Sequence, residues 1–514
     1  KTELYLQAIR SCLDRGREAI VLVPEISLTP QMVERFRGRF GGRVAVLHSR
    51  LSEGERFDEW RRISTGQADV AVGARSAVFA PFRNLGLIII DEEHESSYKQ
   101  EESPKYHARD VALERARRHG AAVILGSATP SLESRREAEE GRYRFLRLDE
   151  RIGGRPLPPV HIVDMREELR AGNRSMFSRR LHAAIADRLD RREQMVLLIN
   201  RRGFATFVLC RSCGYAVLCP HCDIALTYHR RARALRCHYC GYAEREAAAC
   251  PKCQSPHIRY FGTGTQRVEE ELGRAFPGIR VIRMDLDTTG KKGAHERWLS
   301  MFRRHEADVL LGTQMVAKGL DFPLVTLVGV IAADTMLHLP DFRAAERTFQ
   351  LLTQVAGRAG RHELPGEVIV QTYNPEHYSI ALAGRHDCDG FAERELRLRK
   401  ERDYPPYRRL IRIVLSHEQA PALMAWGERL AAELNRLMEA ERERTGGQGA
   451  CEVLGPVPAP ISRLNDRYRF QCVVKYSEDL AAVRCVREAA GVLDDAVRTR
   501  GLQVSIDVDP QMLM

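Results

Sequence analysis

Two segments far apart in the chain carry side chains suited to nucleoside-triphosphate hydrolysis. The first is an apolar run, residues 87–90, followed at once by Asp-Glu-Glu-His at 91–94. A buried strand that delivers acids at its carboxyl end can present a Mg²⁺ ligand and a base that activates water. The second segment, Gln-Val-Ala-Gly-Arg-Ala-Gly-Arg at 354–361, offers fixed positive charge to a transferring phosphoryl group. Together the two segments predict an ATP-driven motor that moves on nucleic acid.

The first two residues, Lys1 and Thr2, fit the end of a phosphate-binding loop of the form G-x-x-x-x-G-K-[ST]. In such a loop the lysine reaches the β- and γ-phosphates and the hydroxyl binds Mg²⁺. The glycine-rich half of the loop is absent from the sequence, and residues 3–9 alternate like the start of an amphipathic helix. We therefore expect a fragment that starts inside its own nucleotide site. For this exact chain the expectation is weak or absent ATP turnover, because Lys1 would be a flexible terminal residue.

Eight of the 13 cysteines form four Cys-x-x-Cys pairs between residues 210 and 253. Two thiolates separated by two residues lie on one tight turn, and two such turns complete a tetrahedral Cys₄ site. The four pairs therefore predict two structural Zn²⁺ ions rather than a disulfide scaffold, which a large chain of intracellular character does not need. The nearby His221, His229 and His238 are expected to be incidental. The predicted ligands are Cys210 and Cys213, Cys219 and Cys222, Cys237 and Cys240, and Cys250 and Cys253.

Length and charge agree with a multidomain enzyme that acts on a polyanion. A chain of 514 residues has room for three or four domains of ~100–200 residues each. The net charge of +11 suits a nucleic acid partner, although charge alone fits an ordinary basic enzyme equally well. The sequence contains no run of the ~20 apolar residues that span a bilayer, and no signal peptide opens it.

The acids belong to a set of short apolar strands that alternate with polar helices. Each strand is followed by a polar loop, a pattern that indicates a parallel sheet covered on both faces. Ligands in such sheets bind beyond the carboxyl ends of the strands, where every polar cluster here falls. The expected strands of this first lobe are 19–23, 44–47, 69–72, 87–90 and 122–125.

A Pro/Gly-bearing stretch at about 151–178 reads as a linker, after which a second α/β lobe of similar design begins. Its expected strands are 194–199, 281–284, 308–311, 325–331 and 366–371, with the cysteine region inserted after the first of them. From about residue 390 the character changes to a small α+β domain. Its expected helices are 391–402, 420–441 and 478–498, and its expected strands are 410–415, 470–474 and 504–508. The predicted domains are 1–150, 151–208 (linker and start of the second lobe), 209–260 (zinc insertion), 261–395 and 396–514.

These lobes and loops resemble superfamily 2 helicases, and the four Cys-x-x-Cys pairs narrow the resemblance to the family of primosomal protein N′, the replication restart helicases (PriA). The motifs that match the family are, beside the cysteines, residues 91–94, 126–130, 312–315 and 354–361, and the tyrosine-bearing loop 96–110. The resemblance covers nearly the whole chain. It departs at the front, where the family carries a DNA-binding region and a complete phosphate loop. The implied fold is α/β, with two RecA-like lobes, a two-zinc insertion in the second, and a small α+β C-terminal domain.

Chemistry and resemblance together suggest roles for the site residues. Asp91 is expected to bind Mg²⁺ mostly through water, and Glu92 to orient and deprotonate the attacking water. Arg358 and Arg361 are the expected arginine fingers, and Gln354 is expected to contact the nucleotide or its water. Lys1 and Thr2 complete the nucleotide-binding set. Family resemblance also pairs the cysteine knuckles in nested fashion, the first with the fourth and the second with the third.

Loops that hold the single-strand backbone in the family correspond here to 24–29 and to the residue pairs Arg75 with Ser76 and Thr313 with Gln314. Such contacts reach phosphates without reading sequence, as a motor requires. Tyr98 and Tyr106 are expected to stack on bases or to couple DNA binding to hydrolysis, with a packing role as the alternative.

Several neighbouring groups have less definite expected roles. Glu93 and His94 are expected to connect the nucleotide site to residues 127–129 and to bound DNA. The basic and aromatic residues of the cysteine region suit strand separation or partner docking, or a solvated surface. Arg343, Glu346 and Arg347 can be interpreted equally well as functional residues or as an ordinary exposed helix face.

The resemblance implies an ATP-dependent 3′→5′ DNA helicase of the primosome that recognises stalled or branched forks and restarts replication. The implied cofactors are ATP, Mg²⁺ and two Zn²⁺. The implied partners are single-stranded and forked DNA, primosome and helicase-loading proteins and single-stranded DNA-binding protein, with a monomer in the bacterial cytoplasm at the nucleoid. The alternatives are a duplex DNA translocase and a non-catalytic DNA-binding or primosome-assembly scaffold. An RNA-linked helicase gives no reason for the eight-cysteine insertion.

Overall fold

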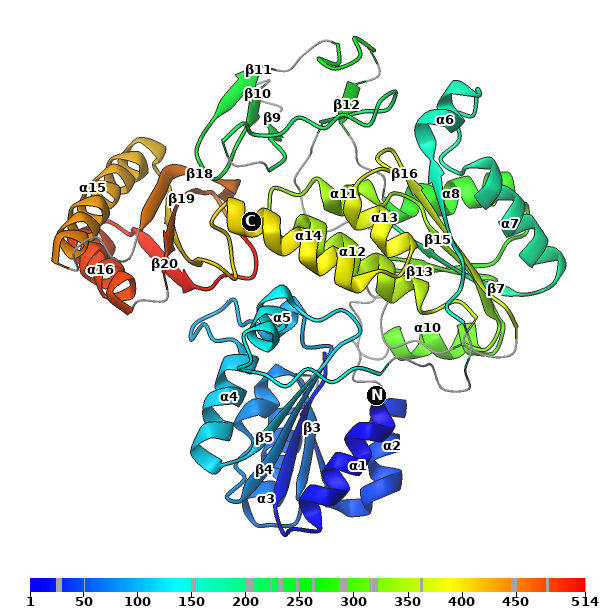
Figure 1. Ribbon diagram of the computed structural model, residues 1–514, viewed down its shortest axis with the longest axis horizontal. Coiled ribbons are helices and arrows are strands. Elements are labelled where there is room, and N and C mark those ends of the chain that lie inside the picture. The colour runs from blue at the N-terminus through cyan, green and yellow to red at the C-terminus, as the bar shows by residue number, and fades with distance from the viewer. Residues whose placement is uncertain are drawn as a thin grey trace. The chain divides into compact units, whose positions relative to one another are not determined.

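A computed structural model of the protein (Figure 1) describes residues 1–24, 30–49, 51–148, 154, 156–199, 208–221, 224–229, 234–245, 249–256, 258–260, 264–285, 294–313, 316, 322–360, 364–444, 451–477 and 480–513. The chain divides into two compact units, Lys1–Phe145 and Leu146–Met514, and each is described by itself. Within the described part of the chain, no helix combines the length and apolar character that crossing a bilayer requires.

The first unit is built on a five-stranded parallel sheet with the strand order β2-β3-β1-β4-β5. All five strands that the sequence predicts are confirmed. The strands are β1 (Glu18–Leu22), β2 (Val44–Leu47), β3 (Val70–Gly73), β4 (Leu85–Asp91) and β5 (Ala122–Gly126). The helices are α1 (Thr2–Leu13), α2 (Pro30–Phe40), α3 (Glu53–Ser64), α4 (Ala108–His119) and α5 (Leu132–Glu139), with 3₁₀ turns at Gly41–Arg43, Arg75–Phe79 and Ser96–Tyr98.

Both faces of this sheet are covered, so its strands read as continuous apolar runs rather than alternating ones. Side chains of α1 and α2, such as Ile9 and Phe36, pack on one face. Side chains of α3 and α4, such as Ile63 and Ala112, pack on the other face. Figure 1 shows α1 and α4 on opposite sides of the sheet.

The second unit contains a six-stranded parallel sheet with the order β13-β14-β7-β15-β16-β6. Its strands are β6 (Val160–Asp164), β7 (Gln194–Leu198), β13 (Val281–Met284), β14 (Val309–Gly312), β15 (Val325–Val330) and β16 (Glu367–Thr372). Helices α7 (Arg179–Asp190) and α8 (Thr265–Ala275) pack on one face. The other face carries α10 (Ala294–Arg303), α11 (Asp334–Leu337), α12 (Ala344–Ala356), α13 (Tyr378–Gly384) and α14 (Cys388–Glu401).

The prediction that residues 151–178 are only a linker is wrong. This stretch contains the edge strand β6 and helix α6 (Met165–Arg170), and β6 pairs with β16 along its whole length. The strand is half-buried throughout, and His161 interrupts its apolar run. An edge strand needs to bury less apolar surface than a central one, so its sequence signal is weaker.

The cysteine region lies after β7 and forms small antiparallel pairs. Strand β8 (Val208–Cys210) pairs with β12 (Ile258–Tyr260), while β10 (Ala234–Arg236) pairs with β9 (Thr227–His229) and β11 (Ala243–Arg245).

The C-terminal domain is an antiparallel sheet of the order β18-β19-β17-β20, covered by helices. The elements are β17 (Arg409–His417), β18 (Glu452–Leu464), β19 (Arg467–Tyr476), β20 (Gln503–Val508), α15 (Ala420–Arg444), α16 (Leu480–Ala490) and α17 (Asp494–Thr499), with a 3₁₀ turn at Gly491–Leu493. Strand β18 escapes prediction because it contains Pro456, Pro458 and Pro460. An edge position tolerates prolines, since one side of the strand donates no ladder hydrogen bonds.

Acid should destabilise the second unit through His338, which lies buried at the end of α11. Burial, assisted by nearby His377, lowers the pKa of His338 to about 3. The unfolded chain takes up a proton near pH 6.5 while the folded one stays neutral, so stability is lost as the pH falls below 6.5. Between pH 7 and pH 5 this residue alone is expected to remove about 2 kcal/mol of unfolding free energy. Urea unfolding of His338→Gln should show a pH-dependent loss smaller by that amount, and an unchanged loss would contradict the prediction.

Candidate nucleotide and zinc sites

The carboxylates of Asp91 and Glu92 lie at the carboxyl end of β4, beside the centre of the first sheet. The chain passes from β1 to β2 on one side and later to β4 on the other, so the strand order reverses between β1 and β4. Such a reversal opens a crevice for ligands at the carboxyl edge of an α/β sheet. Asp91 ends the strand, and Glu92 turns the chain sharply with φ of 49°, an uncommon conformation for a residue with a side chain.

Helix α1 brings a lysine and a tyrosine to these acids. The Lys1 ammonium Nζ lies 2.6 Å from Glu92 Oε1 and 3.4 Å from Asp91 Oδ1. The Tyr5 hydroxyl, one helical turn later, donates to Asp91 Oδ1 at 2.9 Å. A Cβ at Gly126, the last residue of β5, would come within 1.7 Å of the Tyr5 hydroxyl, so any side chain there would displace the tyrosine from Asp91. Thr2 is the first residue of α1.

The electrostatics of this cluster suit a metal and a polyphosphate. Burial by itself would lower the pKa of Lys1, but the negative charges of Glu92 and Asp91 raise it by more. The pKa of Lys1 is therefore above its ordinary value, and the lysine stays positively charged. Burial raises the pKa of Asp91 above its ordinary value, against the opposing charge of Lys1. A half-buried carboxylate is an oxygen ligand of the kind Mg²⁺ prefers, and a fixed ammonium beside it can bind phosphate.

A second layer of contacts links the acids to the segment after β5. The Glu93 carboxylate is buried and accepts hydrogen bonds from Ser131 N (2.6 Å), Ser131 Oγ (3.1 Å) and Ser134 Oγ (2.9 Å). His94 Nδ1 lies 2.7 Å from Ser127 Oγ, which also accepts from the Thr129 amide. The contact between the acidic loop and residues 127–129 that the sequence led us to expect is therefore present.

Arg109 and Tyr5 belong to this site, and the sequence did not single them out. Arg109 Nη1 donates to the hydroxyls of Ser131 and Ser134, and it lies 3.7 Å from Glu93 Oε2. Its signal is its place inside the matching loop 96–110. The signal for Tyr5 is its position four residues after Lys1, on the same face of α1.

The predicted DNA contacts of the first unit differ in accessibility. Tyr98 is 1% exposed, and its hydroxyl donates to the backbone oxygen of Asp91 at 2.6 Å. The prediction that Tyr98 stacks on bases is wrong for this conformation, because its ring is covered by the core and has the alternative packing role. Tyr106 is half-buried and its ring contacts that of Phe79 edge-on at 5.1 Å. Arg75 donates to the backbone oxygens of Ser97 and Lys99, and Ser76 is exposed.

The described predicted residues of the second lobe lie at or just after the carboxyl ends of their own elements. Gln354 lies in the last turn of α12 and Arg358 in the turn that follows, both half-buried. Thr313 directly follows β14 and is half-buried. Arg361 and Gln314 lie outside the described residues.

One of the two interpretations left open for this lobe is wrong. Arg343, Glu346 and Arg347 do not form an exposed helix face, because the first two are 7% and 4% exposed and Arg347 is half-buried.

The cysteine region has the geometry of zinc knuckles. The sulfur atoms of Cys210, Cys213, Cys250 and Cys253 lie within 4.8 Å of one another, as do those of Cys219, Cys237 and Cys240; Cys222 lies outside the described residues. The separations Cys210–Cys253, Cys213–Cys250 and Cys219–Cys240 are 3.7, 3.6 and 3.6 Å. Four sulfurs 2.3 Å from a tetrahedral Zn²⁺ would lie about 3.8 Å apart, so the residues fit that ion. The nested pairing that the resemblance implied is confirmed for the described cysteines.

The turn that follows each described pair explains why the two sulfurs converge. After the first and third pairs come Gly214 and Gly241, with φ of 74° and 81°, whose amides donate back to the oxygens of Cys210 and Cys237. After the fourth pair Gln254 adopts the same left-handed conformation. This backbone reversal suits glycine and directs both sulfurs to one point.

Four family models match successive parts of the chain. They are the DEAD/DEAH box helicase (residues 1–138), the PriA DNA helicase Cys-rich region domain (219–245), the Helicase conserved C-terminal domain (252–363) and the Primosomal protein N C-terminal domain (400–511). Among solved structures, RecG bound to a three-way DNA junction is similar over 77% of this chain and 45% of that one, with 15% identity and a TM-score of 0.42.

Several curated relatives carry the name replication restart protein PriA. The one from Bacillus subtilis (strain 168) is 55% identical, over 100% of this chain and 63% of that protein. The Synechocystis relative is 48% identical, over 99% and 61%, so the chain spans about three-fifths of the length of these two. The Treponema pallidum relative is 42% identical, over 99% of this chain and 75% of that protein. With two helicase lobes, a zinc-binding cysteine region and a matching C-terminal domain, the chain belongs to the replication restart protein PriA family.

Proposed function

We propose that the protein containing this chain is an ATP-dependent DNA helicase that unwinds DNA in the 3′→5′ direction at stalled or branched forks and restarts replication. The observation that carries the proposal is the cluster of Lys1, Tyr5, Asp91 and Glu92 at the strand-order reversal of the first sheet. The family-specific cysteine region and C-terminal domain support replication restart as its setting.

In the proposed hydrolysis step, a water attacks the γ-phosphorus of ATP and the bond to the bridging oxygen of ADP breaks. Lys1 holds the β- and γ-phosphates, with Thr2 beside it, and Glu92 accepts the proton of the attacking water. Asp91 would hold Mg²⁺, and the ion would supply positive charge against the phosphate oxygens. Gln354 is the proposed contact to the nucleotide or its water. Arg358 and Arg361 are the proposed arginine fingers.

For DNA, the proposed contacts to the backbone of a single strand are Arg75, Ser76 and Thr313, which are exposed or half-buried, together with Gln314. Tyr106, half-buried, is proposed to stack on bases or to couple DNA binding to hydrolysis. Arg75 also donates hydrogen bonds to the loop that carries Tyr98, whose hydroxyl donates to the backbone oxygen of Asp91. Binding of a DNA strand at Arg75 can therefore shift Tyr98 and, through it, Asp91. The proposed partners are forked DNA, primosome and helicase-loading proteins and single-stranded DNA-binding protein. The proposed setting is a monomer at the chromosome in the bacterial cytoplasm.

The deciding experiment measures ATP hydrolysis and strand separation by the full-length protein on forked DNA with either a 3′ or a 5′ single-stranded arm. Fork-stimulated hydrolysis with separation that depends on a 3′ arm would support the proposal. Stimulation without strand separation would favour a duplex translocase. Fork binding without turnover would move the protein to the scaffold class.

Two zinc ions per chain are expected, one in each cysteine cluster. Metal analysis of the purified protein should give two, and Cys213→Ser and Cys240→Ser should each give one. The two sets share no ligand, so loss should be independent. Because zinc binding is coupled to folding, each variant should expose its own knuckle to hydrogen exchange. A protein with a single zinc, or a variant that loses both ions, would contradict this assignment.

A further inference from the structure

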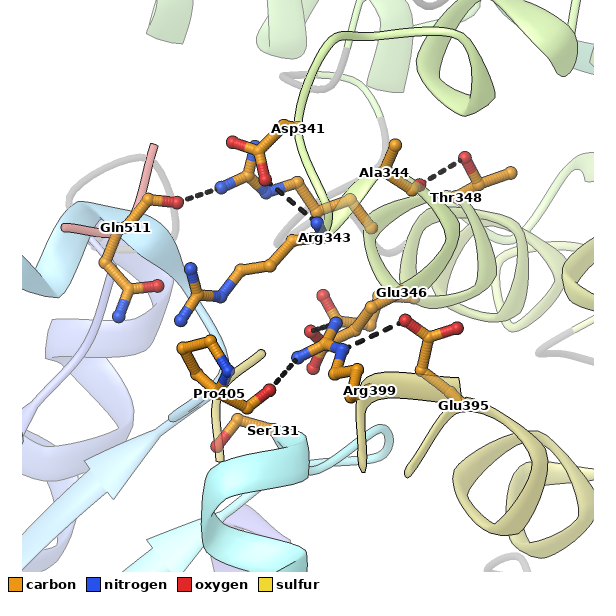
Figure 2. A network of polar contacts seen from close by, with 12 residues as sticks. Ser131, Asp341, Arg343, Ala344, Glu346, Thr348, Glu395, Arg399, Pro405 and Gln511 are labelled. Atoms are coloured by element: carbon orange, nitrogen blue, oxygen red, sulfur yellow. Dashed lines mark hydrogen bonds and ion pairs between the residues drawn. The ribbon is translucent and has the colours of Figure 1, made fainter. Parts of the chain in front are cut away.

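The side chain of Arg399, in α14, is a fully buried cation that ties three segments together (Figure 2). It is 2% exposed. Its guanidinium donates to Glu346 Oε2 in α12 (2.7 Å), to Glu395 Oε1 in its own helix (3.0 Å) and to the backbone oxygen of Pro405 (3.2 Å). Both carboxylates are also buried, at 4% and 3% exposure, so these bonds act in a low-dielectric setting where charge pairs are strong and direction-specific.

The last residues of the chain bind to the segment that precedes and begins α12. Asp341, fully buried, accepts from the amides of Arg343 (2.9 Å) and Leu513 (3.3 Å) and pairs with Arg347. Arg343 donates to the backbone oxygen of Pro510 at 3.2 Å, and Arg347 donates to that of Gln511. Figure 2 shows the Gln511 contact and the Arg399 contacts in one network around the beginning of α12.

Helix α12 connects this network to the predicted nucleotide contacts. It runs without interruption over 13 residues, so with a rise of 1.5 Å per residue it is about 20 Å long. Glu346 lies in its first turn, Gln354 in its last, and Arg358 in the turn beyond. Its buried side chains, such as Phe349 and Leu352, pack in the core of the second lobe. A close-packed interior transmits strain, so a shift at the start of this helix is carried toward its end.

We propose that Arg399, with the chain's last residues, is a positioning element for the arginine motif: it anchors the start of α12 so that Arg358 is held in the geometry that hydrolysis needs. The inference rests on the proposed function, in which Arg358 meets the nucleotide. The contacts between α12 and the C-terminal domain would then contribute to ATP hydrolysis. A displacement of that domain would change the position of Arg358 relative to the nucleotide.

The test compares Arg399→Gln, Arg358→Ala and the double variant in the full-length protein, by fork-stimulated turnover and by thermal unfolding. Because small misplacements of catalytic groups are costly, Arg399→Gln should lower kcat about 10- to 100-fold, with the KM for ATP within about twofold. Arg399→Lys keeps the charge and should recover part of the loss. In the Arg358→Ala background, Arg399→Gln should cause little further loss, because it acts through the same arginine. The matched control is Arg436→Gln, which breaks an exposed pair with Glu433 in α15 and should leave turnover unchanged.

Several outcomes overturn the inference. Unchanged kcat in Arg399→Gln, or a loss that multiplies that of Arg358→Ala, would show a role in general stability only. If Arg358→Ala itself keeps full turnover, the proposed role of the arginine motif fails first. If Arg399→Gln does not fold, Arg347→Gln removes the contact to Gln511 from a more exposed position and answers the same question.

Discussion

Replacing Arg358 with alanine is expected to lower fork-stimulated ATP turnover by about 10³-fold or more, within the range of ~10³–10⁵ found for arginine fingers. Arg358 lies in the turn directly after α12, half-buried, on a segment rich in glycine. A guanidinium there would stabilise negative charge that develops on the phosphoryl oxygens only in the transition state. The loss should therefore appear in kcat, with ATP affinity changed little. Steady-state turnover and equilibrium binding of ATP would separate the two quantities.

Two further variants define how specific that effect is. Arg358→Lys keeps the charge but loses the planar fork of donors, so it should recover only part of the activity. Arg274→Ala removes an exposed arginine that pairs with Glu271 on α8 of the same lobe, and should leave turnover unchanged. Turnover of Arg358→Ala within tenfold of the parent protein would remove this residue from the proposed mechanism.

Replacing Glu92 with glutamine is expected to lower turnover by about 10²–10⁴-fold while ATP still binds. Glutamine keeps the size of the side chain, but its amide cannot accept the proton of the attacking water. Glu92 is suited to the task because its left-handed backbone conformation places the carboxylate beside Lys1 and Asp91. Pre-steady-state measurements on Glu92→Gln should show ATP that is bound to the protein but not cleaved.

The control for this variant is Glu114→Gln on α4, where the carboxylate pairs with Arg117 and Arg118 at the surface. It changes the same functional group and should have no effect on turnover. If Glu92→Gln hydrolyses ATP at the parent rate, another group activates the water. In that case the buried Glu93 is an unsuitable substitute, because its oxygens are already bound by the serines of α5 and its N-terminal cap.

Local patterns were enough for most of the fold. The central strands of both lobes could be predicted because a strand buried on both faces must be apolar along its length, as β3 and β14 are. Strands β6 and β18 could not, because they are edge strands whose half-buried or proline-bearing sequences carry a weak signal. The cysteine spacing predicted the zinc knuckles directly, since a Cys-x-x-Cys turn is a local structure.

The sequence by itself determined the kinds of chemistry present: acids after a buried strand, thiolates at metal-binding spacing, and arginines on a glycine-rich segment. Only the tertiary structure decided which of these groups meet. It buried Tyr98 under the acids and joined Glu93 to Ser131 and Ser134. It also bound the end of the chain to the start of α12 through Arg343 and Arg347. The physical reason is that composition and periodicity report which side a residue faces, whereas a buried polar contact depends on residues far apart in sequence whose hydrogen-bonding groups and charges must be satisfied together.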